Sequence, residues 1–214
     1  MKLIVKYIKP YLFAVLLSLV LLFGQAVSDL TLPNLMSDIV STGIQKGGIE
    51  EVCPEEISEE GLTLLKLFMN GEQQAATEAA YTLQSDGTYK LTAEKGDSLD
   101  AAGEAYNNGC YAMILYLKDM SQAQPEEAAS AEEEEEYSNM DLTELYQMIP
   151  MLQQLPEGSM DPYIKTASDA DGTIASSTGA VFTGLFYQEL GKDVDQIQSF
   201  YIWKEGGKML AVAM

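Results

Sequence analysis

The chain has 214 residues, of which 33 are acidic and 12 are lysine; it contains no arginine or histidine, and its formal net charge is −21. This charge excludes nucleic-acid binding, which needs a basic surface to displace the counterions of phosphate. The lack of histidine excludes every mechanism that uses an imidazole as general base, triad member or metal ligand.

The first ten residues predict a cytoplasmic amphipathic elbow helix, residues 1–10. Three lysines alternate there with apolar residues at helical spacing, and Pro10 separates this segment from the apolar run after it. No acidic residue precedes Asp29. The positive-inside rule therefore places the N-terminus in the cytoplasm and residues 33–205 outside it.

The next segment has the pattern of a membrane-spanning helix. No charged residue occurs from Pro10 to Ser28, a stretch of nineteen residues. Nineteen helical residues extend for about 28 Å, close to the hydrocarbon thickness of a bilayer. We therefore expect transmembrane helix 1 over residues 11–32. A cleaved signal peptide, with a small-residue site at residues 26–28, is the alternative interpretation.

Residues 33–205 form an acidic segment that we expect to be an extracytoplasmic insertion. From Asp29 onward the sequence holds 33 acidic residues and nine lysines, and glutamates gather at residues 50–60 and 126–136. Cation binding is one interpretation of these clusters, and a solvated, self-repelling loop is the other. The second cluster predicts a flexible Glu-rich linker over residues 121–140, which divides the insertion into two parts.

The part before the linker predicts a mainly helical structure with one small hairpin. Apolar residues recur at helical spacing in residues 56–69 and 99–120, and residues 71–83 are rich in the helix formers alanine and glutamine. A turn signal followed by a short alternating segment indicates a hairpin near residues 83–95. The most apolar stretch, residues 110–117, is the candidate buried core.

The part after the linker predicts three more helices, over residues 142–155, 177–190 and 193–201. Asp141 fits the N-cap position of the first helix, with Glu144 three residues further on, and Pro150 is expected to break it. Gly191 fits the position that follows the C-terminal end of the second helix.

The last nine residues, 206–214, contain an apolar run that follows two glycines. We interpret them as the start of transmembrane helix 2, with a C-terminal strand as the alternative. The predicted fold class is therefore mainly α. It combines one transmembrane helix with a mostly helical extracytoplasmic insertion domain, truncated at the start of a second transmembrane helix.

No pattern in the chain identifies a catalytic, cofactor-binding or metal-binding residue, so none is predicted and the chain is not expected to be an enzyme. Residues 169–173 match the DxDGT signature of phosphoryl-transferring aspartate enzymes. The preceding residues are too polar for the buried strand that this site requires, which favours a turn. No GxxxxGK[ST] phosphate-binding loop occurs in the sequence.

The two cysteines, Cys53 and Cys110, both lie in the predicted external region, where a disulfide can form. The sequence alone does not place them within bonding distance. A disulfide and two independent small apolar residues therefore both remain open.

Two blocks of the sequence are distinctive. The first contains YIKPY at residues 7–11, DLTLPNLMSDIV at 29–40 and GIQKGGIE at 43–50. The second contains YQELGKDVDQIQ at residues 187–198, followed by Tyr201-Ile202 and Gly206-Gly207. These blocks resemble ABC exporter half-transporters of the multidrug and lipid exporter type, in which permease and ATPase are fused. The resemblance covers residues 1–50 and about 178–214.

One subgroup of that family has a long insertion between its first two transmembrane helices. The resemblance therefore implies a fragment of an ATP-driven exporter in the bacterial cell membrane, contributing helix 1 and an extracytoplasmic cap, without ATPase activity of its own. ATP and Mg would bind outside this segment, in the parent transporter. The implied partners are the lipid bilayer, the remaining transmembrane helices and nucleotide-binding domain of the parent, and a second half-transporter, often a different one. A secreted or membrane-anchored acidic binding module is the second hypothesis.

Overall fold

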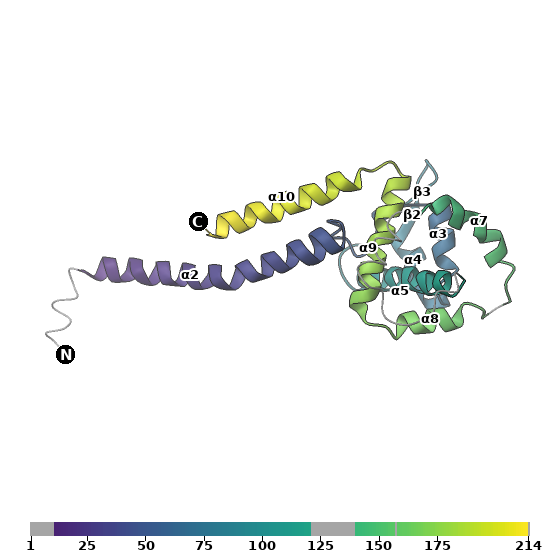
Figure 1. Ribbon diagram of the computed structural model, residues 1–214, viewed down its shortest axis with the longest axis horizontal. Coiled ribbons are helices and arrows are strands. Elements are labelled where there is room, and N and C mark those ends of the chain that lie inside the picture. The colour runs from purple at the N-terminus through teal and green to yellow at the C-terminus, as the bar shows by residue number, and fades with distance from the viewer. Residues whose placement is uncertain (1–10, 121–139, 157, 214) are drawn as a thin grey trace.

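Two long helices extend side by side from a domain built mainly of shorter helices (Figure 1). The computed structural model describes residues 11–120, 140–156 and 158–213. The predicted elbow helix, residues 1–10, and nearly all of the predicted Glu-rich linker lie outside the described residues. The elements are α2 (Leu12–Asp38), η2 (Ile39–Gln45), β1 (Glu56–Ser58), α3 (Glu59–Lys66), α4 (Gly71–Ala80), β2 (Tyr81–Leu83), β3 (Thr88–Leu91), α5 (Asp97–Met120), α7 (Leu142–Leu152), α8 (Asp161–Ser168), α9 (Gly172–Glu189) and α10 (Val194–Ala213).

Helix α2 and the π-helical turn η2 follow each other directly and form one long, mostly apolar helical segment. Within the described part of the chain, the segment Phe13–Gln45 is the one helix long and apolar enough to cross a membrane. The helix is longer than the predicted 11–32 because it passes through Pro33 without ending. Proline removes one backbone hydrogen bond, but α2 also packs against the neighbouring helix α10, and such packing supplies most of the stability of helices in proteins.

Three short antiparallel strands form a sheet with the order β1-β3-β2. The hairpin of β2 and β3 confirms the hairpin predicted near residues 83–95. Strand β1 lies where the sequence predicts the start of a helix, and β2 occupies the end of the predicted helix 71–83. Three residues are too few to show the alternating pattern of a strand. Strands β1 and β2 form because they pair with β3, which local sequence does not reveal.

The core of the domain surrounds α5, which packs against α4, α8 and α9. The predicted apolar stretch 110–117 is confirmed as part of this core, since most of its residues are buried. Tyr106 is also fully buried, and its hydroxyl is 2.9 Å from Thr183 Oγ1 and 3.2 Å from the carbonyl oxygen of Gly179. These bonds satisfy the one polar group of a large buried ring.

The helices after residue 140 differ from their predicted boundaries. Asp141 does cap α7, but its side chain accepts from the backbone N–H of Thr143, and Pro150 lies inside the helix instead of breaking it. Helix α8, which the sequence did not predict, comes next. The predicted helix 177–190 begins earlier, at Gly172, and Gly191 after its end has the positive φ expected of a C-terminal glycine.

The DxDGT segment joins two helices. Asp169 ends α8, and the Asp171 side chain caps α9 by accepting from the N–H of Thr173 at 2.8 Å. The first aspartate therefore follows a helix and not the buried strand of a phosphoryl-transfer site. The turn predicted from the sequence is confirmed.

Cys53 and Cys110 are free and fully buried, so the structure contains two separate thiols and no disulfide between them. Burial raises the pKa of both thiols, most strongly that of Cys110. The thiolate is the reactive form of cysteine, so a raised pKa and an inaccessible sulfur both protect these residues.

We predict that neither cysteine reacts with maleimide in the folded protein and that both react after unfolding in urea. The measurement is the mass of the intact chain after labelling with and without denaturant. One or two labels added under native conditions would contradict the buried positions of the thiols.

Candidate functional site

Helix α10 runs antiparallel to α2 and η2 over most of its length (Figure 1). Ser28 Oγ lies 3.0 Å from the carbonyl oxygen of Val212 near one end of this contact. Near the other end, the Gln198 side-chain amide donates to the carbonyl oxygen of Gly43 at 2.9 Å. We call α2, η2 and α10 together the helix pair, and the region where it meets the domain the junction.

Two glycines allow the backbones at the junction to approach closely. A Cβ on Gly43 would lie 3.3 Å from side-chain atoms of both Tyr201 and Ile202. Gly48 has φ +77°, and a Cβ there would lie 2.7 Å from Gln198 Cα, which is closer than atoms pack. The N–H of Gly48 donates to the carbonyl oxygen of Thr42 at 2.8 Å. Glycine is therefore required at position 48 for both conformation and space.

A network of charged side chains lies beside these glycines. Glu205, on α10, is only 3% exposed. Its carboxylate is 2.5 Å from Lys208 Nζ and 3.9 Å from Lys204 Nζ, and Lys204 also binds Glu50 at 2.7 Å. The buried carboxylate is thus compensated, which burial of a charge requires. Because Glu50 follows η2 and the other three residues belong to α10, the network ties the two helices together.

A second set of contacts fixes the start of α10 to the domain. Lys192, between α9 and α10, binds Glu56 of β1 at 3.0 Å and lies 4.3 Å from the ring centre of Tyr187. The Tyr187 hydroxyl accepts from the N–H of Glu55 at 3.0 Å. The direction in which α10 leaves the domain is therefore set by contacts with the strand β1.

We predict a small acid sensitivity from Glu56. The hydrogen bond from Lys192 lowers the pKa of this carboxyl below its usual 4.5. Because the pKa of Glu56 is lower in the folded than in the unfolded protein, the charged carboxylate stabilises the fold at pH values above the unfolded pKa. That stabilisation is lost as the pH falls through the folded pKa. Because the pair is partly exposed, the expected contribution is at most about 0.5 kcal/mol.

The measurement compares urea unfolding at pH 7 and pH 3 for the wild type, Glu56→Gln and Lys192→Met. Both variants should be slightly less stable at pH 7. The deficit of Glu56→Gln should shrink as the pH falls toward 3, whereas Lys192→Met should keep the part of its deficit that comes from the lost contact with Tyr187. A Glu56→Gln deficit that is the same at pH 7 and pH 3 would show that the carboxylate charge is not responsible.

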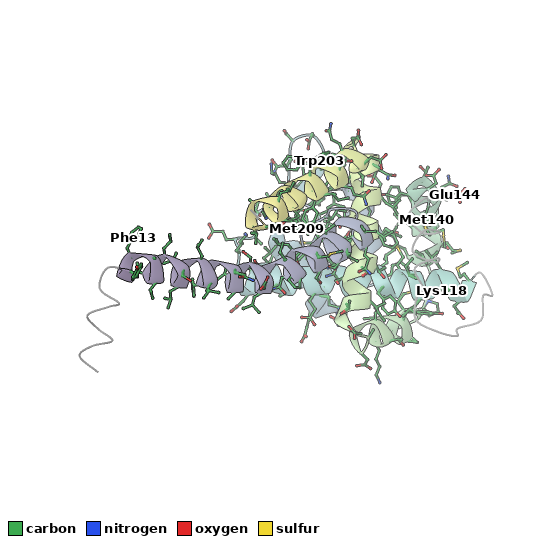
Figure 2. The ribbon with its side chains drawn as sticks, turned by 60° about the vertical axis from the view of Figure 1, so that its left-hand side comes forward. Phe13, Lys118, Met140, Glu144, Trp203 and Met209 are labelled. Carbon is green, nitrogen blue, oxygen red and sulfur yellow. The ribbon has the colours of Figure 1, made fainter. Side chains whose placement is uncertain are left out.

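An open groove of about 760 Å³ lies between α7 and the C-terminal end of α9. Its lining includes Met140, Tyr146 and Glu189, and α7 is on the side of the domain away from the helix pair (Figure 2). The Tyr146 hydroxyl donates to Glu189 Oε2 at 2.7 Å, and Ser58 Oγ donates to the same oxygen at 3.1 Å. Ser58 Oγ also accepts from the N–H of Gly61, as the N-cap of α3.

Through these bonds, Ser58 and Tyr146 connect β1, α7 and α9. The Ser58 hydroxyl is committed to a cap and a carboxylate, and burial raises the pKa of Tyr146, which opposes its ionisation. Neither group is therefore activated as a nucleophile. Among the described residues, no group of three or more Cys, Asp or Glu side chains is arranged to hold a metal ion.

The sequence predicts no catalytic, cofactor-binding or metal-binding residue, and this absence stays a prediction. Gly43, Gly48 and Glu205, which make the contacts of the junction, were not identified from the sequence. The available signal was weak: a glutamate with lysines one position before and three positions after it on one helix. Comparison of the chain with protein families, with curated proteins and with solved structures finds no match.

Proposed function

We propose that this chain contributes transmembrane helix 1 and an extracytoplasmic cap to an ATP-driven exporter of the ABC type. The observation that carries the proposal is the antiparallel helix pair: α2 enters the domain and α10 leaves it side by side (Figure 1). When a domain is inserted between two neighbouring transmembrane helices, the chain must enter and leave the domain at adjacent points, through two antiparallel helices. The sequence blocks that resemble exporter half-transporters lie largely on these two helices.

The surface of α2 supports a membrane position for the helix pair. Its apolar side chains from Phe13 to Phe23 are largely exposed, and no charged side chain interrupts them. An exposed apolar surface of this length is unfavourable in water and favourable in lipid. With the lysines before Pro10, the proposed orientation has the N-terminus in the cytoplasm and the acidic domain outside.

In this proposal the domain shapes the outer mouth of the export pathway. Its negative field would raise the local concentration of cations there. ATP and Mg would bind to a nucleotide-binding domain outside these 214 residues, because the sequence has no phosphate-binding loop. The proposed partners are lipid, further transmembrane helices, that nucleotide-binding domain and a second, different half-transporter, and no nucleic acid.

The groove favours a second candidate function, an acidic binding module anchored to the membrane. Its three charged lining residues, Glu60, Asp141 and Glu189, are all acidic, and Leu142 and Leu185 add apolar surface. Such a module would work without an ATPase. The two candidates differ in the gene sequence expected downstream of codon 214: the exporter requires a further apolar helix and later a GxxxxGK[ST] loop in the same frame.

The experiment that tests the cap role removes the domain and keeps the helix pair. A short Gly-Ser linker replaces residues 53–191, and export is measured in cells that carry the complete gene. A matched control exchanges exposed Thr82 for alanine and should export normally. Export that is lost or altered, with the protein still in the membrane, supports a cap; unchanged export of every cargo tried would rule it out.

A further inference from the structure

The side of α10 that faces away from α2 carries a line of exposed apolar residues. Phe200, Trp203 and Leu210 are 71%, 82% and 64% exposed, and Gly207, where an added Cβ meets nothing, lies between the last two. Their spacing of three, four and three residues places them on one helical face. The buried Tyr201 belongs to the opposite face. Figure 2 shows Trp203 on the outer side of the helix pair.

The charged residues of this part of α10 are neutralised within the protein. Lys204, Glu205 and Lys208 pair with one another and with Glu50, as described for the junction. The outer surface around Trp203 is therefore apolar and without unpaired charge. Helix α2 also carries exposed apolar residues in the part that packs along α10, since Leu30 and Met36 are 73% and 60% exposed.

The contacts between the helices give the level of Trp203 along α2. Ser28 lies beside Val212, and Gly43 lies beside Ile202, so Trp203 is level with η2, roughly one helical turn beyond the end of α2 at Asp38. From Tyr11 to Asp38 an α-helix rises about 40 Å. This matches the roughly 40–45 Å thickness of a bilayer with its headgroup layers. Tyrosine and tryptophan are enriched at both membrane–water boundaries.

We propose that Trp203 lies at the outer lipid–water interface, with lipid covering the line from Phe200 to Leu210. This inference rests on the proposed membrane position of α2. It places the outer boundary farther toward the domain than the sequence predicts. On the first helix the boundary lies just beyond Asp38 instead of at residue 32, and on α10 it lies near Trp203 instead of at residue 206. The domain then lies directly on the bilayer surface. Asp29 is the one charged residue of α2 between Tyr11 and Asp38. On α10, Lys204, Glu205 and Lys208 also lie on the membrane side of Trp203, where their pairing with one another lowers the cost of burial.

Trp203 is the only tryptophan of the chain, so its fluorescence tests the proposal directly. The full chain is reconstituted into phosphatidylcholine vesicles whose acyl chains carry bromine either near the headgroup or deep in the bilayer. Iodide on both sides of the bilayer reports exposure to water. We expect blue-shifted emission, a larger loss of emission with shallow bromine than with deep bromine, and little loss with iodide.

Two variants in a Trp203→Phe background calibrate the result. Phe13→Trp places the probe within the proposed span, and Leu83→Trp places it on the exposed strand β2 of the domain. Quenching of Trp203 by iodide alone, or by neither quencher because protein covers it, would overturn the inference. If bromine quenches Phe13→Trp but not Trp203, the span stands and the interface position fails; if it quenches neither, the span itself fails.

Discussion

Replacing Gly48 with alanine is expected to lower the free energy of unfolding of the domain by about 3 kcal/mol. Holding a non-glycine residue in a left-handed conformation costs about 1–2 kcal/mol, and φ at this position is +77°. The added Cβ would also lie 2.7 Å from Gln198 Cα, a backbone atom that moves only with α10. Such overpacking costs about 1–3 kcal/mol more.

The neighbouring glycine is the matched control. Gly47 also has a positive φ, +60°, but an added Cβ there meets no atom within 4 Å. Gly47→Ala should therefore cost only about 1 kcal/mol, the conformational part of the effect. Stability is measured in detergent micelles by urea-dependent maleimide labelling of the two buried cysteines. Equal losses for both variants would mean that α10 does not press against Gly48.

Phe186→Ala is expected to cost about 3–5 kcal/mol, the usual loss when a buried phenylalanine is truncated. Phe186 is fully buried, its ring centre is 6.3 Å from that of Phe182, and Gly61 of α3 is the residue that gives it room. Because α9 connects the core to α10, the loss would weaken the support of the helix pair as well as the core.

Two further variants keep this prediction testable if Phe186→Ala does not fold. Phe186→Leu retains most of the volume and should cost less than about 1.5 kcal/mol. Phe200→Ala removes the same side chain from a position that is 71% exposed and should change domain stability by less than about 0.5 kcal/mol. Equal losses at positions 186 and 200 would contradict the assigned core.

The longest elements could be predicted because their patterns are local. The uncharged run that ends at Ser28 predicts α2, and apolar periodicity predicts α5 and most of α9. The turn at residues 169–173 also results from local chemistry, since aspartate caps helices and favours turns. The mainly helical fold with one candidate membrane helix is accordingly confirmed.

The remaining elements depend on contacts between distant parts of the chain. Strand β1 forms because Glu56 to Ser58 pair with residues 88–90, and nothing in those three residues alone indicates a strand. Gly48 matters only because Gln198 lies against it, 150 positions further along. The burial of Glu205 likewise depends on how α10 packs against α2 and η2. No local periodicity contains this information, so the junction could not be predicted from the sequence.

Site-directed labelling with a membrane-impermeant maleimide tests the central claim, a membrane helix pair that carries an external domain, most directly. The native thiols are buried, so Asp86→Cys, on the exposed β2–β3 turn, and Lys9→Cys, before the span, report the two sides separately. In intact cells we expect labelling at position 86 and labelling at position 9 only after the membrane is permeabilised. Labelling of position 9 in intact cells, or protection of position 86, would contradict the account.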